Sequence, residues 1–132
     1  MSEVPQTESF RFRREEHLRR PGDFRLVYDR RRSVSDHWLI VYGRENGLPH
    51  LRLGLSVSRK VGPAVHRNRL RRLYREAFRL TRQAMPVGLD IVLIPRRPDE
   101  PTLEVLKQSL PKLVNSVAKK LASDKKPAEG PA

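Results

Sequence analysis

Arginines recur along one segment of this 132-residue chain at a spacing that places them together on a helix surface. The apolar residues of the segment follow the i, i+3, i+4, i+7 pattern of a buried helical stripe: Leu70, Leu73, Tyr74 and Ala77. At about 100° per residue, polar side chains fall on the opposite side: Asn68, Arg71, Arg72, Arg75, Arg79 and Arg82. Guanidinium groups bind phosphate in bidentate fashion and stack on planar rings. The pattern therefore predicts a surface that recognises a polyanion.

Like charges at i, i+4 on this helix argue against a purely structural role. Arg67 and Arg71, and again Arg71 and Arg75, stand four residues apart, where they repel by about 0.2–0.5 kcal/mol per pair. Glu76 is the only acid in the segment, and Arg69, on the flank, could pair with it or cap a sheet edge. The alternative is an ordinary solvated charged face. A bound polyanion explains the repeated repulsion more simply.

The residues before this helix predict how it is positioned. Residues 51–58 alternate apolar and polar, as a strand with one buried face does. We expect this strand to pair with a second one at 38–42 as an antiparallel hairpin. Gly62 can serve as the helix N-cap with Pro63 in the first helical position, and the helix is predicted to span about 63–84.

Three further elements complete the predicted domain. A short helix opens at Pro21 and ends in three arginines, and an apolar strand covers 89–94. A last helix begins near Thr102, and Pro111 is expected to kink it or split it in two. We predict a mostly flexible segment at 1–18, a single domain at 19–122 and a disordered basic tail at 123–132.

Composition narrows the classes of partner. The chain has 28 Lys and Arg against 15 Asp and Glu, a net charge of +13, which favours nucleic acid and, less strongly, an anionic membrane. It has no cysteine, so disulfides and cysteine-based zinc sites are excluded. The first residues are polar, and no apolar run has the length of a membrane span. We expect a cytoplasmic protein.

The acids and histidines do not indicate an active site within the chain. Metal-dependent nucleases need clustered carboxylates, whereas Glu76, Asp90 and Asp99 are scattered over separate elements. The four histidines show no ligand spacing: His17, His37, His50 and His66. We therefore expect neither a catalytic residue nor a metal ligand in the protein itself.

The motif order resembles a known family. Ser-Val-Ser-Arg-Lys-Val-Gly at 56–62, Ala64-Val65, Arg-Asn-Arg at 67–69 and Arg-Arg-Leu-Tyr-Arg-Glu at 71–76 resemble the signature of the bacterial ribonuclease P protein subunit. Residues 17–24 resemble the opening helix of the family, and 90–96 resemble its third strand. The resemblance covers about residues 10 to 121.

The resemblance implies both a fold and a function. The fold is a small two-layer α/β sandwich of the α+β class, ribosomal-protein-like, in the order helix-strand-strand-helix-strand-helix with a left-handed crossover. The function is that of the protein subunit of ribonuclease P, a ribonucleoprotein endonuclease that removes the 5′ leader of precursor tRNA. In that family the RNA subunit carries the active site and requires Mg²⁺. The protein is expected to act as a monomer that binds ribonuclease P RNA and precursor tRNA.

The resemblance also implies two groups of site residues. The first group matches the family positions that contact the catalytic RNA. Its members are Arg59, Lys60, Arg67, Asn68, Arg69, Arg71, Arg72 and Arg75. Those of a cleft for the substrate leader are Phe24, Tyr28, Tyr42 and Ser56. Aromatic side chains stack on unpaired bases with little sequence preference. The helical spacing of Phe24 suits a core position equally well.

A second class of function fits the charge alone. A general RNA-binding protein or RNA chaperone, like many ribosomal proteins, would also be basic and arginine-rich. Only the motif order favours the ribonuclease P subunit over this alternative.

Overall fold

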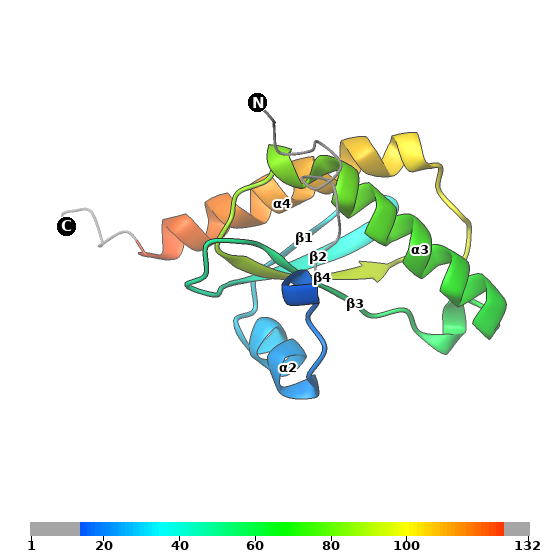
Figure 1. Cartoon of the computed structure of the whole chain (residues 1–132), viewed down its shortest axis with the longest axis horizontal. Coiled ribbons are helices and arrows are strands. Elements are labelled where there is room, and N and C mark those ends of the chain that lie inside the picture. The colour runs from blue at the N-terminus through cyan, green and yellow to red at the C-terminus, as the bar shows by residue number, and fades with distance from the viewer. Residues whose placement is uncertain (1–13, 126–132) are drawn as a thin grey trace, which may run out of the picture.

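A single four-stranded sheet organises the protein, with α3 and α4 on one face and α2 on the other (Figure 1). The computed structural model describes residues 14–125. The helices are η1 (Arg14–Glu16), α2 (Pro21–Asp29), η2 (Arg59–Val61), α3 (Ala64–Thr81), η3 (Arg82–Ala84) and α4 (Leu103–Lys125). The strands are β1 (Ser33–Ser35), β2 (Leu39–Glu45), β3 (Arg52–Leu55) and β4 (Leu89–Pro95). No helix of this region has the length and apolar content that a membrane span requires.

The sheet has the strand order β1-β2-β4-β3, so the predicted hairpin is wrong. β4 lies between β2 and β3, antiparallel to β2 and parallel to β3. Five successive residues of β4, from Leu89 to Leu93, are buried, which is typical of a central strand covered on both faces. The predicted order of α2, α3, α4 and the longer strands is confirmed. The short β1, which pairs with β2, is an addition that its polar sequence Ser-Val-Ser did not indicate.

The core fills the space between the sheet and the helices α3 and α4. The predicted α3 stripe is confirmed: Leu70, Tyr74 and Ala77 are buried, and Leu73 packs against the core. Phe78, fully buried, completes the stripe. Burial also raises the pKa of the Tyr74 hydroxyl. α3 is thus held rigidly, and the polar face that it presents has a fixed position.

The beginning of α3 differs by one residue from the prediction. Gly62 does not cap α3 but ends η2, at φ 153°, a conformation that side-chain-bearing residues rarely adopt. Pro63 is then the N-cap and Ala64 the first helical residue. Ser58 caps η2, because its Oγ accepts a hydrogen bond from the Lys60 N–H at 3.3 Å. The basic residues Arg59 and Lys60 therefore lie on a short helical turn directly before α3.

The last helix is longer than predicted and is not split. α4 runs as one helix through Pro111, and it continues to Lys125 instead of ending at 122. Its buried stripe extends along the sheet as far as Leu121 and compensates for the backbone hydrogen bond that a proline removes. Beyond Leu121, Asp124 accepts hydrogen bonds from Arg30 and Arg32, which fastens the last turn. Only residues 126–132 of the predicted tail lie outside the described region.

The end of the predicted flexible segment is part of the fold. Residues 1–13 lie outside the described region, but η1 and the residues after it are placed. His17 forms a parallel bridge with Leu53, and the Leu18 N–H donates to the Leu53 carbonyl at 2.9 Å. Leu18 is buried beside Val27 and Val92, and this apolar contact explains why the chain is ordered before α2 begins.

Candidate nucleic-acid interface

The residues predicted to meet RNA gather on η2 and on the outer face of α3. Most of them are exposed: Arg59, Lys60, Asn68, Arg69, Arg72 and Arg75. Arg67 and Arg71 are half-buried. Since the opposite side of α3 is buried in the core, these side chains extend from a rigid element and not from a mobile tail.

Neutral groups orient the two half-buried arginines. The Arg67 Nε donates to the Gly62 carbonyl at 3.2 Å, and the Arg71 Nη1 donates to the Asn68 Oδ1 at 2.8 Å. Neither contact neutralises a charge. Within residues 14–125, Arg72 and Arg75 form no ion pair with a carboxylate. Partial burial, with Arg71 and Arg19 nearby, lowers the pKa of Arg75, which shows how closely these cations are crowded.

Other arginines of α3 and η3 already have carboxylate partners. Arg69 pairs with Glu100 at 3.4 Å, so the suggested pair with Glu76 is wrong. Glu76 instead accepts two hydrogen bonds from Arg79, at 2.6 and 3.1 Å. Arg82 pairs with the buried Glu16. Arg79 and Arg82, which the helical pattern placed on the polyanion face, are therefore neutralised within the protein.

The predicted aromatic residues come together on the other face of the sheet. Phe24 of α2 lies over Gly54 of β3: a Cβ on Gly54 would be 2.7 Å from the Phe24 Cζ. Tyr28 and Tyr42 form an edge-to-face pair with ring centroids 5.1 Å apart. All three rings are half-buried and pack on a small cluster beneath α2. Phe24 is thus a packing residue and also part of the aromatic face on which the leader groove is predicted.

Ser56 extends this face beyond the end of β3. Its N–H donates to the Leu93 carbonyl at 3.0 Å, which continues the β3–β4 pairing by one residue. Because strand side chains alternate, Ser56 is on the same face as Gly54. Ser56 is half-buried and therefore reachable from solvent. The four predicted cleft residues thus share one face of the sheet.

A buried acid, Asp90, organises the basic end of the same face. Arg52 binds it through two hydrogen bonds, at 2.8 and 2.7 Å, and the Asn46 amide donates to it at 2.9 Å. Arg44 is 3.7 Å away. A buried carboxylate must be paired, and Asp90 has no exposed surface. The sequence showed Asp90 only as an isolated acid, but its place in a strand of buried residues was a signal of such pairing.

The described part of the chain offers no set of metal ligands. Among residues 14–125, no three His, Cys, Asp or Glu side chains lie together in a way that could hold a metal ion. The carboxylates here accept hydrogen bonds from arginines, as Asp90 and Glu76 do. The chemistry of this surface is therefore charge and aromatic contact.

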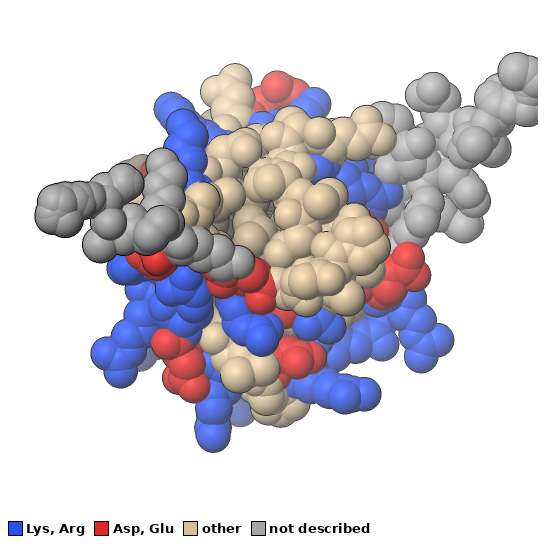
Figure 2. Space-filling model, turned by 90° about the vertical axis from the view of Figure 1, so that its left-hand side faces the viewer, with Lys and Arg blue, Asp and Glu red and all other residues tan. Residues whose placement is uncertain are grey.

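The positive charge is unevenly distributed over the surface. On the face shown in Figure 2, Lys and Arg side chains surround a continuous uncharged area and do not cover it evenly. An arginine helix fixed on one face of a sheet, with partly exposed aromatic rings on the other face, offers groups for phosphate binding and for base stacking. Such a fold and surface define a small RNA-binding protein of the α+β class.

Comparison with known proteins identifies the family within that class. Residues 12–118 match the family model described as Ribonuclease P, and the chain belongs to this family of ribonuclease P proteins. The "Ribonuclease P protein component" of Thermotoga maritima is 45% identical over 91 residues, which cover 69% of this chain and 76% of that protein. The corresponding protein of Oleidesulfovibrio alaskensis is 40% identical over 112 residues, 81% of this chain and 90% of the relative.

Solved structures agree with this assignment. The ribonuclease P protein from Thermotoga maritima superposes with a TM-score of 0.70 at 35% identity, covering 76% of this chain and 96% of that one. The Staphylococcus aureus protein superposes with a TM-score of 0.67 at 34% identity, covering 79% and 95%. The resemblance read from the sequence and the predicted fold class are confirmed.

Proposed function

We propose that this chain, as the protein subunit of ribonuclease P, binds the catalytic RNA through α3 and η2 and the 5′ leader of precursor tRNA through the aromatic groove. Its family membership makes it a component of the ribonucleoprotein endoribonuclease that processes tRNA, and it makes ribonuclease P RNA its partner.

The unpaired arginines of α3 are the observation that carries the proposal. Arg72 and Arg75 are exposed, have no carboxylate partner among the described residues and lie on a helix whose opposite face is buried. Arg79, on the same helix, has Glu76. A phosphate backbone supplies the missing negative charge, and each phosphate that is neutralised releases a counterion from the RNA.

The groove suits a single strand of variable sequence. Each base that stacks on an aromatic ring contributes about 1–3 kcal/mol, with little discrimination between bases. Tyr28 and Tyr42 each keep part of their surface exposed, so their rings remain available while their edge-to-face contact fixes them. A subunit with such a groove can accept the differing leaders of many precursor tRNAs.

Cleavage itself is assigned to the RNA subunit with its Mg²⁺. Two carboxylates of the described region, Asp90 and Glu76, are committed to Arg52 and Arg79. The protein would then contribute substrate affinity and stabilise the folded RNA. We further propose that one copy of the protein joins one RNA, in the cytoplasm.

A salt titration of binding tests the arginine assignment. For duplex-like RNA, the slope of log K against log salt is negative, and each arginine–phosphate interaction that a substitution removes makes it less steep by about 0.9. We expect Arg72→Ala and Arg75→Ala to make this slope less steep with ribonuclease P RNA. Arg79→Ala is the matched control, since this residue is on the same helix but is already paired with Glu76. If all three variants keep the parental slope, α3 is not the phosphate-binding surface.

Crosslinking tests the groove separately. A photoreactive nucleotide in the leader is expected to form adducts with Tyr28 or Tyr42, the half-buried aromatic pair of the proposed groove. Adducts found only on α3 would contradict the leader assignment and leave the assignment of the catalytic RNA intact.

A further inference from the structure

A second group of unpaired cations lies before α2, outside both surfaces described above. Arg14, Arg19 and Arg20 are exposed, and none of them forms an ion pair with a carboxylate in the described region. This differs from the arginines after α2, where Arg30 and Arg32 share Asp124. A basic segment without internal partners invites an external anion.

The backbone holds these cations in a defined place at the edge of the sheet. β3 is an edge strand, and residues 17–19 run along its open side through the His17–Leu53 bridge. Side chains alternate along such a segment. Leu18 points inward and is buried, so His17 and Arg19 point outward on the same side. The segment brings His17 and Arg19 next to Arg75 of α3.

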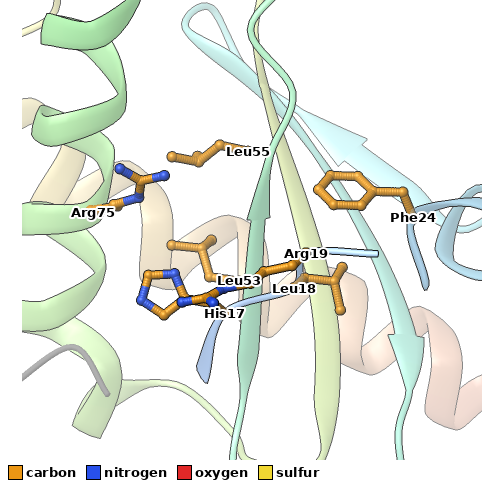
Figure 3. Close-up of a pocket in the computed structure, with 7 residues that line it drawn as sticks. All are labelled: His17, Leu18, Arg19, Phe24, Leu53, Leu55 and Arg75. Atoms are coloured by element: carbon orange, nitrogen blue, oxygen red, sulfur yellow. The ribbon is translucent and has the colours of Figure 1, made fainter. Parts of the chain in front are cut away.

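Two hollows adjoin this segment and share His17 and Arg19. The first has a volume of ≈ 380 Å³. Its lining residues are His17, Leu18, Arg19, Phe24, Leu53, Leu55 and Arg75. In Figure 3 the Arg75 guanidinium extends from α3 toward Leu55, and His17 and Arg19 lie on the segment beside β3. Cations thus border an apolar floor.

The second hollow is almost entirely basic. It also has a volume of ≈ 380 Å³, and its lining residues are Arg14, His17, Arg19, Arg20, Asp23 and Arg52. Arg52 is neutralised by Asp90, which leaves Asp23 as the one carboxylate of the lining set. The remaining arginines of this lining, Arg14, Arg19 and Arg20, outnumber that single acid. The pKa of His17 is lowered by burial and by Arg19 and Arg75.

We propose that the edge surface formed by Arg14, His17, Arg19, Arg20 and Arg75 binds a single-stranded RNA segment. Phosphates occupy the two hollows, and an unpaired base lies on the floor made by Leu53, Leu55 and Phe24. A duplex would leave this floor unused, because its bases are stacked on one another. The inference rests on the proposed function in one respect, namely that the polyanion is RNA.

The position of the edge surface links the two surfaces already described. Arg75 belongs to the arginine helix, and Phe24 belongs to the aromatic groove. The strand bound here is therefore either the leader as it leaves the groove or an unpaired segment of the catalytic RNA near α3. Both present the same phosphodiester chemistry, and the experiment separates them.

The test compares Arg19→Gln with Lys112→Gln in the reconstituted ribonucleoprotein. Both variants remove one exposed positive charge, but Lys112 is on α4, which packs over β1 and β2 and not over the β3 edge. Binding is titrated against salt for the catalytic RNA, for precursor tRNA with its leader and for mature tRNA without it. Each phosphate contact with a single strand contributes about 0.7 to the slope of log K against log salt.

We expect Arg19→Gln to make the slope of log K against log salt less steep by about 0.7 for the leader-bearing precursor or for the catalytic RNA. The slope for mature tRNA should not change. The RNA affected identifies the source of the strand. An unchanged slope for all three RNAs, or an equal decrease with Lys112→Gln, overturns the proposal. Arg72→Ala is measured in parallel: if it too keeps the parental slope, the proposed function itself fails.

Discussion

The contact between Phe24 and Gly54 yields the sharpest prediction about the groove. A Cβ at position 54 would lie 2.7 Å from the Phe24 Cζ and 2.9 Å from its Cε2, against an optimal carbon–carbon separation of about 3.5–4.0 Å. The ring would have to retreat by about 1 Å. The Leu18 Cδ2, 3.1 Å from the same Cβ, limits the space below it. Overpacking of this kind costs about 1–3 kcal/mol.

Gly54→Ala is therefore expected to lower the free energy of unfolding by about 1–3 kcal/mol, measured by urea denaturation. Since Phe24 is on α2 with Tyr28, the displaced ring also moves one wall of the groove, and the affinity for leader-bearing precursor should fall. Phe24→Leu offers a smaller side chain. In that background, Gly54→Ala should cost less, which a double-mutant cycle measures.

Gly22→Ala is the matched control for this substitution. A Cβ on Gly22 would meet nothing within 4 Å, and alanine favours a helix over glycine by about 0.5–1 kcal/mol. We expect Gly22→Ala to leave stability unchanged or to raise it. If Gly54→Ala is as stable as the parent and binds the leader equally well, the close packing of α2 on the sheet is refuted.

Three further predictions concern the charged groups. Asp90→Ala should lower the free energy of unfolding, measured in urea, by about 3 kcal/mol. This is the lower end for a broken buried ion pair, because Arg52 and Arg44 keep 24% and 31% of their side-chain surface exposed. An unchanged urea midpoint would contradict the role of this pair. Hydrogen bonds from Arg32 and Arg30 lower the pKa of Asp124 to about 2 from 3.8. The contribution of Asp124 to the stability of the fold is therefore present above pH 4 and is lost as the pH falls toward 2. Asp124→Asn should remove that part of the acid denaturation curve. Burial, with Arg19 and Arg75 nearby, lowers the pKa of His17 below 6.5, so its contribution to the stability of the fold is present above that pH and is lost as the pH falls. An NMR titration of the free protein should give a pKa below 6.5, and this pKa should rise when phosphate binds. A value at or above 6.5 in the free protein would be inconsistent with this environment.

Periodicity in the sequence predicted which faces are buried but not which strands are neighbours. The alternation of residues 51–58 placed Leu51, Leu53 and Val57 correctly in the core. It could not show that β4 inserts between β2 and β3, because the pairing partner is set by the tertiary fold. The apolar run of β4 from Ile91 to Ile94 was the available signal for a central position.

Ion pairs were the least predictable part of the site. The partners of Arg69 and Arg82 are Glu100 and Glu16, which come from loops or turns far away in the sequence. A helical pattern orders side chains on one helix and says nothing of acids supplied by other segments. It therefore overestimated the polyanion face by including Arg79 and Arg82.

The family resemblance supplied the groove residues, and the structure explains why they meet. Tyr28 and Tyr42 come from a helix and a strand 14 positions apart in numbering, and the packing of α2 on the sheet joins them. The proposed role of Arg19 and Arg20 had no counterpart in the sequence prediction, because they follow directly after a segment predicted to be flexible. The alternation of His17, Leu18 and Arg19 was the signal that this segment runs beside a strand.

The central claim is that this chain assists ribonuclease P RNA and is not a general RNA binder. The direct test is reconstitution with bacterial ribonuclease P RNA and precursor tRNA at low Mg²⁺, with removal of the 5′ leader as the readout. We expect the protein to stimulate correct 5′ processing, and we expect Arg72→Ala to weaken this stimulation while Arg79→Ala does not. Equal binding to unrelated RNAs, with no stimulation of leader removal, would contradict it.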